Sequence, residues 1–250
     1  MAVSTEQQLQ ERIAELESAL ANRADDAAAK EQQLERYAAD LRETFKEERV
    51  RAHELRRSYM LTVRALASAV EARDAYTGRH AERVAAYGLQ IATAAGMSLG
   101  DEPQIEFGFL LHDAGKVAVP DAILFKPGPL TPAERAIIEQ HPVTGSEIVR
   151  DIEFLGAARD VIRSHHERWD GTGYPDRLAG PDIPLSARAF AVADTLDALT
   201  TNRPYRRASS FAKARLIILR GSGSHFDPEV IAAFDSLPDS VLEDIRKQIG

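Results

Sequence analysis

Residues 9–20, LQERIAELESAL, place Leu or Ile at alternating steps of four and three. Residues 34–45, LERYAADLRETF, repeat this spacing. Apolar side chains at such steps form the seam of a coiled coil. The seam weakens at residues 23–30, where its positions hold Ala or charged side chains, and it resumes imperfectly over residues 55–62. The pattern therefore predicts a coiled-coil helix at the N-terminal end.

Glycine and proline are confined to the rest of the chain. All 15 Gly and all 12 Pro occur at Gly78 or later. Residues 1–77, rich in Ala, Glu, Gln, Leu and Arg, are therefore predicted to be one long helix. Because a helix this polar cannot bury its apolar stripe alone, we predict a homodimer through a stalk at residues 1–59, about 100 Å long if straight. The structural alternative is a solvated single helix or a partly disordered tail.

Composition excludes several classes of protein. The 250 residues include no Cys, which rules out a disulfide framework, a zinc ribbon and a thiol nucleophile. The 39 acidic and 31 basic side chains give a net charge of −8, which argues against a nucleic-acid-binding surface. We also expect no membrane span and no secretion signal.

Residues 60–250 are predicted to be an all-α body. Strand signals are poor there, whereas helix starts are marked by the capping box at Thr131–Glu134 and by the N-cap at Asp227. Further helices are predicted over 187–199 and 211–219, and long loops near 114–130 and 167–185.

Seven side chains in this body are candidate metal ligands. They are His80, His112, Asp113, His141, His165, His166 and Asp194. Asp113 and Asp194 adjoin apolar runs, where an uncompensated carboxylate is costly. Each has a structural alternative: Arg188 could pair with Asp194, and His165 and His166 could be surface residues at a helix C-terminus.

Taken together, the seven are most simply explained by bound metal. Imidazoles with carboxylates and no thiolate suit a divalent transition metal rather than Ca or Mg. Seven ligands exceed the needs of one tetrahedral ion, so two ions sharing a carboxylate are predicted. Such a pair is suited to hydrolysis of a phosphoester.

Two motifs, HDAGK at 112–116 and HHERWDGTGYP at 165–175, resemble the HD-GYP phosphodiesterases, a bacterial branch of the HD metal-dependent hydrolases. Further similarity covers about residues 60–235. It is carried by the segments 71–80, 126–131, 141–142, 194–200 and 203–206. The resemblance implies an all-helical HD-GYP bundle that cleaves cyclic di-GMP to pGpG, with further cleavage to GMP left open.

The resemblance also assigns roles. One ion, iron or manganese, would be held by His80, His112, Asp113 and Asp194. Asp113 would bridge to a second ion held by His141, His165 and His166. Lys116 would reach a phosphate oxygen and act with Asp113 in catalysis, Arg203 and Arg206 would meet phosphate or guanine, and Gly173 and Tyr174 would shape the adjoining loop.

Two positions depart from the family pattern. Members with three metals carry Glu where this chain has Tyr76, so two ions are favoured. Arg206 replaces a common Lys, and the two cations differ in geometry. Asp170 or Glu167 could protonate the leaving oxygen or could simply orient the loop.

Two alternatives remain for function. One is a signalling adaptor with negligible turnover, and the other is a hydrolase of another cyclic dinucleotide such as cyclic GMP-AMP. In either case we expect a bacterial cytoplasmic protein whose stalk could also bind a regulatory partner.

Overall fold

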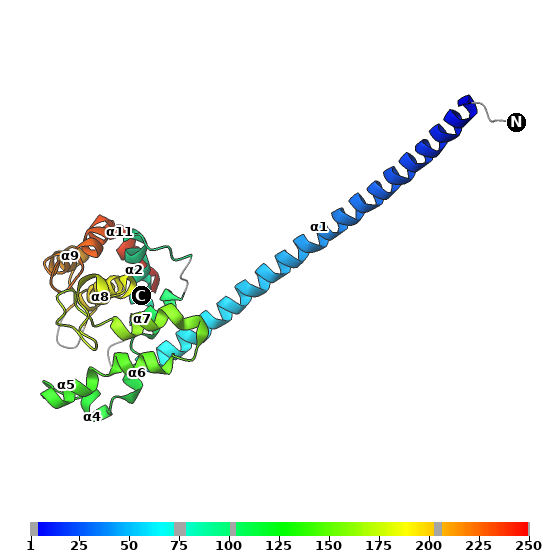
Figure 1. Cartoon of the computed structure of the whole chain (residues 1–250). Coiled ribbons are helices and arrows are strands. Elements are labelled where there is room, and N and C mark those ends of the chain that lie inside the picture. The colour runs from blue at the N-terminus through cyan, green and yellow to red at the C-terminus, as the bar shows by residue number, and fades with distance from the viewer. Residues whose placement is uncertain (1–4, 73–78, 101–103, 203–206, 250) are drawn as a thin grey trace. The chain divides into compact units, whose positions relative to one another are not determined.

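The computed structural model describes residues 5–72, 79–100, 104–202 and 207–249. Regular secondary structure in these ranges is helical, apart from one isolated bridge between Ser222 and Phe226 (Figure 1). The predicted all-α fold is thus confirmed. The chain divides into two compact units, Met1–Ser58 and Tyr59–Gly250. Across the described ranges, no helix combines the length and apolar character that a membrane crossing requires.

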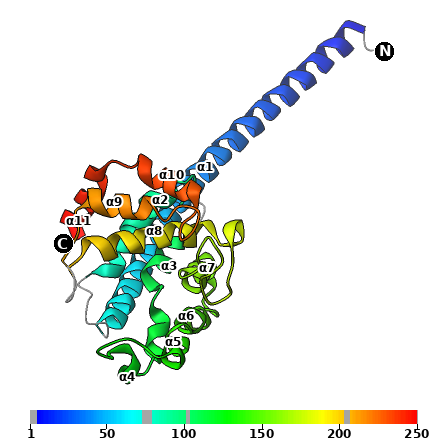
Figure 2. The same cartoon turned by 90° about the vertical axis from the view of Figure 1, so that its left-hand side faces the viewer.

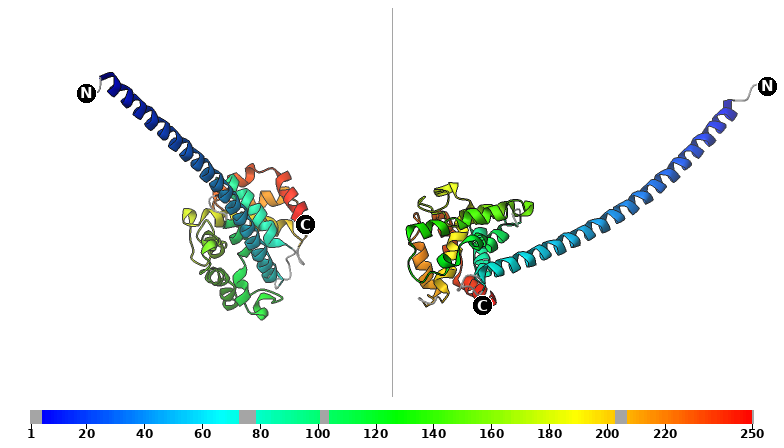
Figure 3. Two further views of the ribbon diagram at one scale, coloured as in Figure 1. Left: turned by 90° about the vertical axis from the view of Figure 1, so that its right-hand side faces the viewer. Right: turned by 90° about the horizontal axis from the view of Figure 1, so that it is seen from below.

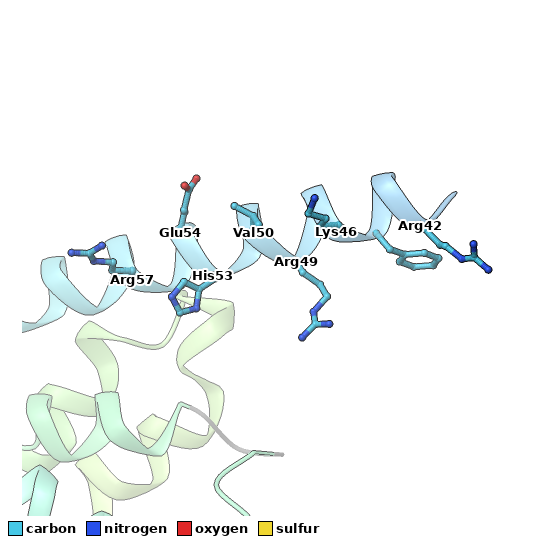
Figure 4. Close-up of a pocket in the computed structure, with 8 residues that line it drawn as sticks. Arg42, Lys46, Arg49, Val50, His53, Glu54 and Arg57 are labelled. Atoms are coloured by element: carbon cyan, nitrogen blue, oxygen red, sulfur yellow. The ribbon is translucent and has the colours of Figure 1, made fainter. Parts of the chain in front are cut away.

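The first unit consists of most of α1 (Thr5–Glu71), which runs through it as one unbroken ribbon (Figure 3). Its apolar stripe is on the surface, and Leu9 and Leu20 each expose more than half of their area. Opposite charges lie one turn apart along it, for example Arg12 Nη1 and Glu15 Oε2 at 2.8 Å. Such exposed ion pairs contribute little to the stability of a helix in water. Basic side chains project from the helix between Arg42 and Arg57 (Figure 4). The apolar stripe remains available to a partner.

The second unit is a bundle of mostly short helices that follows the last turns of α1. They are α2 (His80–Ala94), α3 (Ile105–Leu111), η1 (Ala114–Ala118), α4 (Asp121–Leu124), α5 (Pro132–Ile138), α6 (His141–Ile148), η2 (Glu153–Leu155), α7 (Gly156–Ser164), η3 (Gly180–Asp182), α8 (Leu185–Thr200), α9 (Phe211–Leu219), α10 (Pro228–Ser236) and α11 (Asp239–Ile249). The helix predicted over 211–219 has those bounds, and α8 extends its predicted range at both ends. The two predicted loops are interrupted by η1, α4 and η3, which are too short to give a periodic pattern.

The predicted caps are present. The backbone N–H of Glu134 donates to the Thr131 hydroxyl at 3.3 Å, and the Glu134 carboxylate accepts from the Thr131 N–H at 2.7 Å. Asp227 accepts from the backbone of Glu229 at 2.8 Å. These bonds satisfy amides that have no partner within the first turn of a helix. They fix where α5 and α10 begin.

Helix α8 lies at the centre of the bundle. It packs against α2, α7, α9 and α10. Figure 2 shows it crossing the unit with α9 and α10 on one side and α3 and α7 on the other. Phe190 is fully buried, with its ring 5.5 Å from that of Phe109. Burying one such side chain stabilises the fold by about 1.5–3 kcal/mol, so the carboxylates that α8 carries are held on a rigid element.

A glycine brings η1 against α6. A Cβ at Gly115 would overlap the carbonyl oxygen of His141 and approach the backbone nitrogen of Gly145 to 2.6 Å. Only a residue without a side chain permits this approach. The contact places Asp113 and Lys116, on either side of Gly115, beside the start of α6.

Candidate metal centre

Three histidines at helix ends share one kind of backbone contact. His112 follows α3, His141 begins α6 after the end of α5, and His165 follows α7. Each Nδ1 lies near the carbonyl oxygen three residues earlier, at 2.9 Å from Phe109, 2.7 Å from Ile138 and 2.8 Å from Ile162. An Nδ1–H that donates to a carbonyl leaves the lone pair on Nε2, the arrangement that suits a metal ligand.

The Nε2 atoms of His141 and His165 face one another at 3.1 Å. With both Nδ1 atoms donating to the backbone, both Nε2 atoms are acceptors and neither can donate to the other. A cation between them resolves that conflict. His166 joins the pair, since one ring nitrogen of each of the three histidines lies within 4.8 Å of the others. The donor set therefore fits a bound metal ion.

Burial keeps these imidazoles neutral. It lowers the pKa of His165 well below its ordinary value and, with the nearby His141, lowers that of His166 to about 3. It also lowers the pKa of His141. His165 and His166 do lie at the C-terminal end of α7, but they are buried and half-buried, so the alternative of surface residues is wrong.

The Asp113 carboxylate lies between two of these histidines. Oδ2 is 3.1 Å from His112 Nε2 and 2.8 Å from Lys116 Nζ, and Oδ1 is 3.4 Å from His141 Nε2. Burial alone would raise the pKa of Asp113, but His112 and Lys116 hold it well below its usual range. The carboxylate stays ionised and presents one oxygen to each side, as a bridging ligand requires.

His80 and Asp194 form the opposite end of the cluster. His80 is the first residue of α2, and its Nε2 lies 3.4 Å from Asp194 Oδ1 on α8. The His80 ring is 5.6 Å from that of His112, which is itself 5.3 Å from that of His165. All seven sequence-predicted ligands are thereby brought into one connected cluster.

Asp197, one turn after Asp194 on α8, was not singled out as a site residue from the sequence. Its Oδ2 lies 2.7 Å from His80 Nδ1, and Arg83 Nε donates to its Oδ1 at 2.6 Å. Burial would raise the pKa of Asp197, but the hydrogen bonds with His80 and Arg83 lower it to about 2. The ionised carboxylate orients the ring of His80, as carboxylates do behind metal-binding histidines. The spacing of three from Asp194 was the available signal, because it places both on one face of α8.

Arg188 does not pair with Asp194. Its Nη1 lies 2.5 Å from Asp227 Oδ2, and its Nε donates to the carbonyl oxygen of Ile183 at 2.8 Å. The structural alternative for Asp194 is therefore wrong, and this carboxylate has His80 as its neighbour instead.

The loop that contains Gly173 and Tyr174 closes over the histidines. A Cβ at Gly173 would lie 2.6 Å from the His166 carbonyl oxygen, so only glycine lets the loop approach. The Tyr174 ring lies 4.7 Å from that of His166, and burial raises the pKa of Tyr174. The predicted substrate ligands Arg203 and Arg206 lie outside the described residues, as does Tyr76.

A cleft of about 330 Å³ opens beside the cluster. Its walls include His165, His166, Tyr174 and Asp194, together with residues that the sequence did not single out: Arg135, Glu139, Arg168 and His225. Arg135 and Arg168 are cations, which favour an anionic ligand, while Glu139 and Asp194 place two carboxylates in the same lining.

Glu167 and Asp170 have contacts within the loop. Glu167 Oε1 accepts from the backbone N–H of Asp176 at 2.7 Å, and Asp170 Oδ1 accepts from the hydroxyl and the backbone N–H of Thr172. These contacts favour the loop-orienting alternative over a role in proton transfer.

Comparison with known proteins identifies the family. The model of the HD domain family matches residues 64–230, so this chain belongs to that family. A 3'3'-cGAMP-specific phosphodiesterase of Vibrio cholerae is 40% identical over 194 residues, which cover 77% of this chain and 34% of that protein. A cyclic di-GMP phosphodiesterase of Thermotoga maritima is 40% identical over 180 residues, covering 71% and 49%.

A solved structure has the same fold. It is a cyclic GMP-AMP-specific phosphodiesterase of Vibrio cholerae, with a TM-score of 0.56 at 22% identity, covering 75% of this chain and 52% of the solved chain. This chain thus spans from about a third to about half the length of these relatives.

Proposed function

We propose that this chain is a metal-dependent phosphodiesterase that hydrolyses cyclic di-GMP to pGpG. The observation that carries the proposal is the convergence of five imidazoles and two carboxylates beside a cleft whose lining includes two arginines. The relatives named above act on cyclic dinucleotides, which supports this class of substrate.

In this proposal the cluster holds two divalent ions, iron or manganese. His80, His112, Asp113 and Asp194 would hold one ion, and His141, His165 and His166 would hold the other together with Asp113. When bound, such a pair offsets the charge of a phosphodiester and supplies hydroxide near neutral pH. The 3.1 Å approach of His141 and His165 and the two-sided carboxylate of Asp113 support the assignment.

The chain's own cations would bind the substrate. Lys116 lies 2.8 Å from Asp113 and would reach a phosphate oxygen next to the bridging carboxylate. Arg135 and Arg168 line the cleft and would attract a dianionic dinucleotide into an otherwise acidic protein. On the resemblance alone, Arg203 and Arg206 complete this set. Gly173 and Tyr174 would form the wall against which the ligand lies.

A second candidate is hydrolysis of the hybrid cyclic GMP-AMP. It is favoured by the Vibrio cholerae relative that is named for this nucleotide. Among the described residues, none that lines the cleft distinguishes guanine from adenine. Chromatography of the products therefore identifies the substrate.

The test combines elemental analysis with a nucleotide panel. Protein purified without oxygen is analysed for metal, loaded with Mn²⁺ or Fe²⁺ and given cyclic di-GMP, cyclic GMP-AMP and pGpG, with products separated by chromatography. We expect pGpG from cyclic di-GMP, and loss of turnover in His112→Ala with helical content unchanged. His53→Ala, in the first unit, is the control and should retain turnover.

Each outcome has a distinct meaning. Undiminished turnover in His112→Ala would overturn the site assignment. Binding of a nucleotide without turnover by metal-loaded wild type would establish a signalling adaptor instead, and turnover of cyclic GMP-AMP alone would change the substrate.

The N-terminal stripe supports a further part of the proposal. Its exposed Leu side chains would pair with those of a second copy, giving a homodimer through residues 1–59. A regulatory protein that binds this stalk is an additional partner in the same proposal.

A further inference from the structure

The second unit carries an apolar groove that the catalytic proposal does not use. It has a volume of about 520 Å³. Tyr59 and Leu66 of α1 belong to its lining and are called the first wall here; Ile152 and Phe154 also line it and are called the second wall, and Val117 lines it as well. Leu66 and Val117 expose 55% and 54% of their areas. Large apolar side chains that gather on one exposed surface indicate an interaction site.

The first wall is in heptad register with the N-terminal seam. Counted in steps of four and three, the seam that begins at Leu34 keeps its register as far as Ala69, with the charged Glu48 and the polar Thr62 among its positions. The positions are Leu34, Ala38, Leu41, Phe45, Glu48, Ala52, Leu55, Tyr59, Thr62, Leu66 and Ala69. The last four of these all line the groove. The residues that would meet a partner helix along the stalk therefore continue as the wall of the groove.

The groove wall adjoins the face that α1 turns to its own unit, and Val63 belongs to both. Val63 and Ala67 are 4% and 5% exposed and belong to the core. Leu66, next to Ala67 in the sequence, is more than half exposed. The rings of Tyr59 and Phe154, which also line the groove, stack with their centroids 4.6 Å apart.

We propose that a second copy of this chain occupies the groove, with residues 59–70 of its α1 lying parallel to the same residues of the first copy. In a two-fold pair each helix contacts the other along the heptad positions and also contacts the other's Ile152–Phe154 wall. The proposal rests on the pairing of the stalks and extends it into the second unit.

The interface so formed adjoins the candidate metal centre. Leu111 and Ala114 line the groove, and they flank His112 and Asp113 in the sequence. A partner helix in the groove therefore packs against the segment that carries two proposed ligands. The same segment of the chain would thus contact the partner and carry ligands of the centre.

Single cysteines test this arrangement, because the chain has none of its own. In the full chain, Leu66→Cys should form a disulfide-linked dimer on treatment with diamide, as seen on a non-reducing gel, since equivalent heptad positions face each other in a parallel pair. Leu61→Cys is the matched control on the same helix. Leu61 is 60% exposed against 55% for Leu66, but it does not line the groove.

A third cysteine separates this proposal from the pairing of the stalks. Crosslinking of Leu41→Cys without crosslinking of Leu66→Cys would overturn the groove proposal and leave the stalk pairing intact. Failure of both would overturn both, and equal crosslinking of Leu61→Cys and Leu66→Cys would overturn the groove proposal, because the contact would then not depend on the heptad position.

The second wall is tested by charge. Ile152→Glu in the full chain should weaken the dimer by at least about tenfold, measured by sedimentation on dilution, because a carboxylate would be buried against the partner helix. Ile217→Glu on α9 is the matched control, with 40% exposure against 38% for Ile152. Equal dissociation constants for the two variants would overturn the assignment of the groove.

Discussion

Replacing Asp197 by Asn keeps the size of the side chain and removes the charge that holds two neighbours. Its oxygens lie 2.7 Å from His80 Nδ1 and 2.6 Å from Arg83 Nε. Arg83 is 2% exposed, so its guanidinium would lose its buried counter-charge. Breaking such a pair costs about 3–5 kcal/mol of the free energy of unfolding. Arg246, whose Nη1 lies 3.4 Å from Asp197 Oδ1, would lose the same counter-charge.

The same change should weaken metal binding. With Asp197 ionised, the Nδ1–H of His80 has a charged acceptor that fixes the ring with Nε2 toward Asp194. Loss of such a partner behind a ligand lowers metal affinity by about 10–100-fold. We expect that decrease for Mn²⁺ in isothermal titration calorimetry, under conditions where circular dichroism shows the variant to be folded.

Asp227→Asn is the matched control. Asp227 is equally buried and pairs with Arg188, another arginine, but it caps α10 and contacts none of the seven proposed ligands. Its substitution should cost comparable stability in urea unfolding and leave Mn²⁺ affinity unchanged. Wild-type Mn²⁺ affinity in Asp197→Asn, or equal losses in the two variants, would refute a positioning role for Asp197.

Two further predictions concern the packing and charge of the second unit. Gly115→Ala sets a methyl group against the His141 carbonyl, so urea unfolding should show a loss of about 1–3 kcal/mol. A Cβ at Gly156 would have no atom within 4 Å, so Gly156→Ala should have a free energy of unfolding equal to or above that of wild type. Equal unfolding curves for the two variants would contradict the close packing of η1 on α6. The hydrogen bond from Lys126 lowers the pKa of Glu134 from 4.5 to about 2, so its stabilising contribution is complete above about pH 4.5 and is lost as the pH falls through about 2. The difference in melting temperature between wild type and Glu134→Gln should shrink over that interval, and a constant difference would count against the ion pair.

Local signals in the sequence account for much of the fold. The bonds of Thr131 and Asp227 are made within a single helical turn, so the sequence alone predicts them. The candidate ligands could be found as a set, because Asp113 and Asp194 adjoin apolar runs and the histidines of the same unit supply further metal-binding side chains.

What the sequence could not supply depends on pairs that are distant in the chain. Arg188 was the nearest cation to Asp194, yet it pairs with Asp227, which lies 39 residues away. Asp197 acquires its role only because α2 packs on α8 and brings His80 to it across 117 residues. Arg135 likewise becomes part of the cleft wall only when α5 is folded near α7 and the loop after it.

The backbone contacts of His112, His141 and His165 explain how short helices can build the candidate centre. The last turn of a helix leaves carbonyl oxygens without partners in the helix. Each of these histidines follows such a turn and lies within hydrogen-bond distance of one of its carbonyls through Nδ1. The helix end thus gains a donor, and the imidazole is fixed in the tautomer whose Nε2 can bind a cation. Three of the proposed ligands are therefore oriented by the backbone, whereas His80 is oriented by the side chain of Asp197.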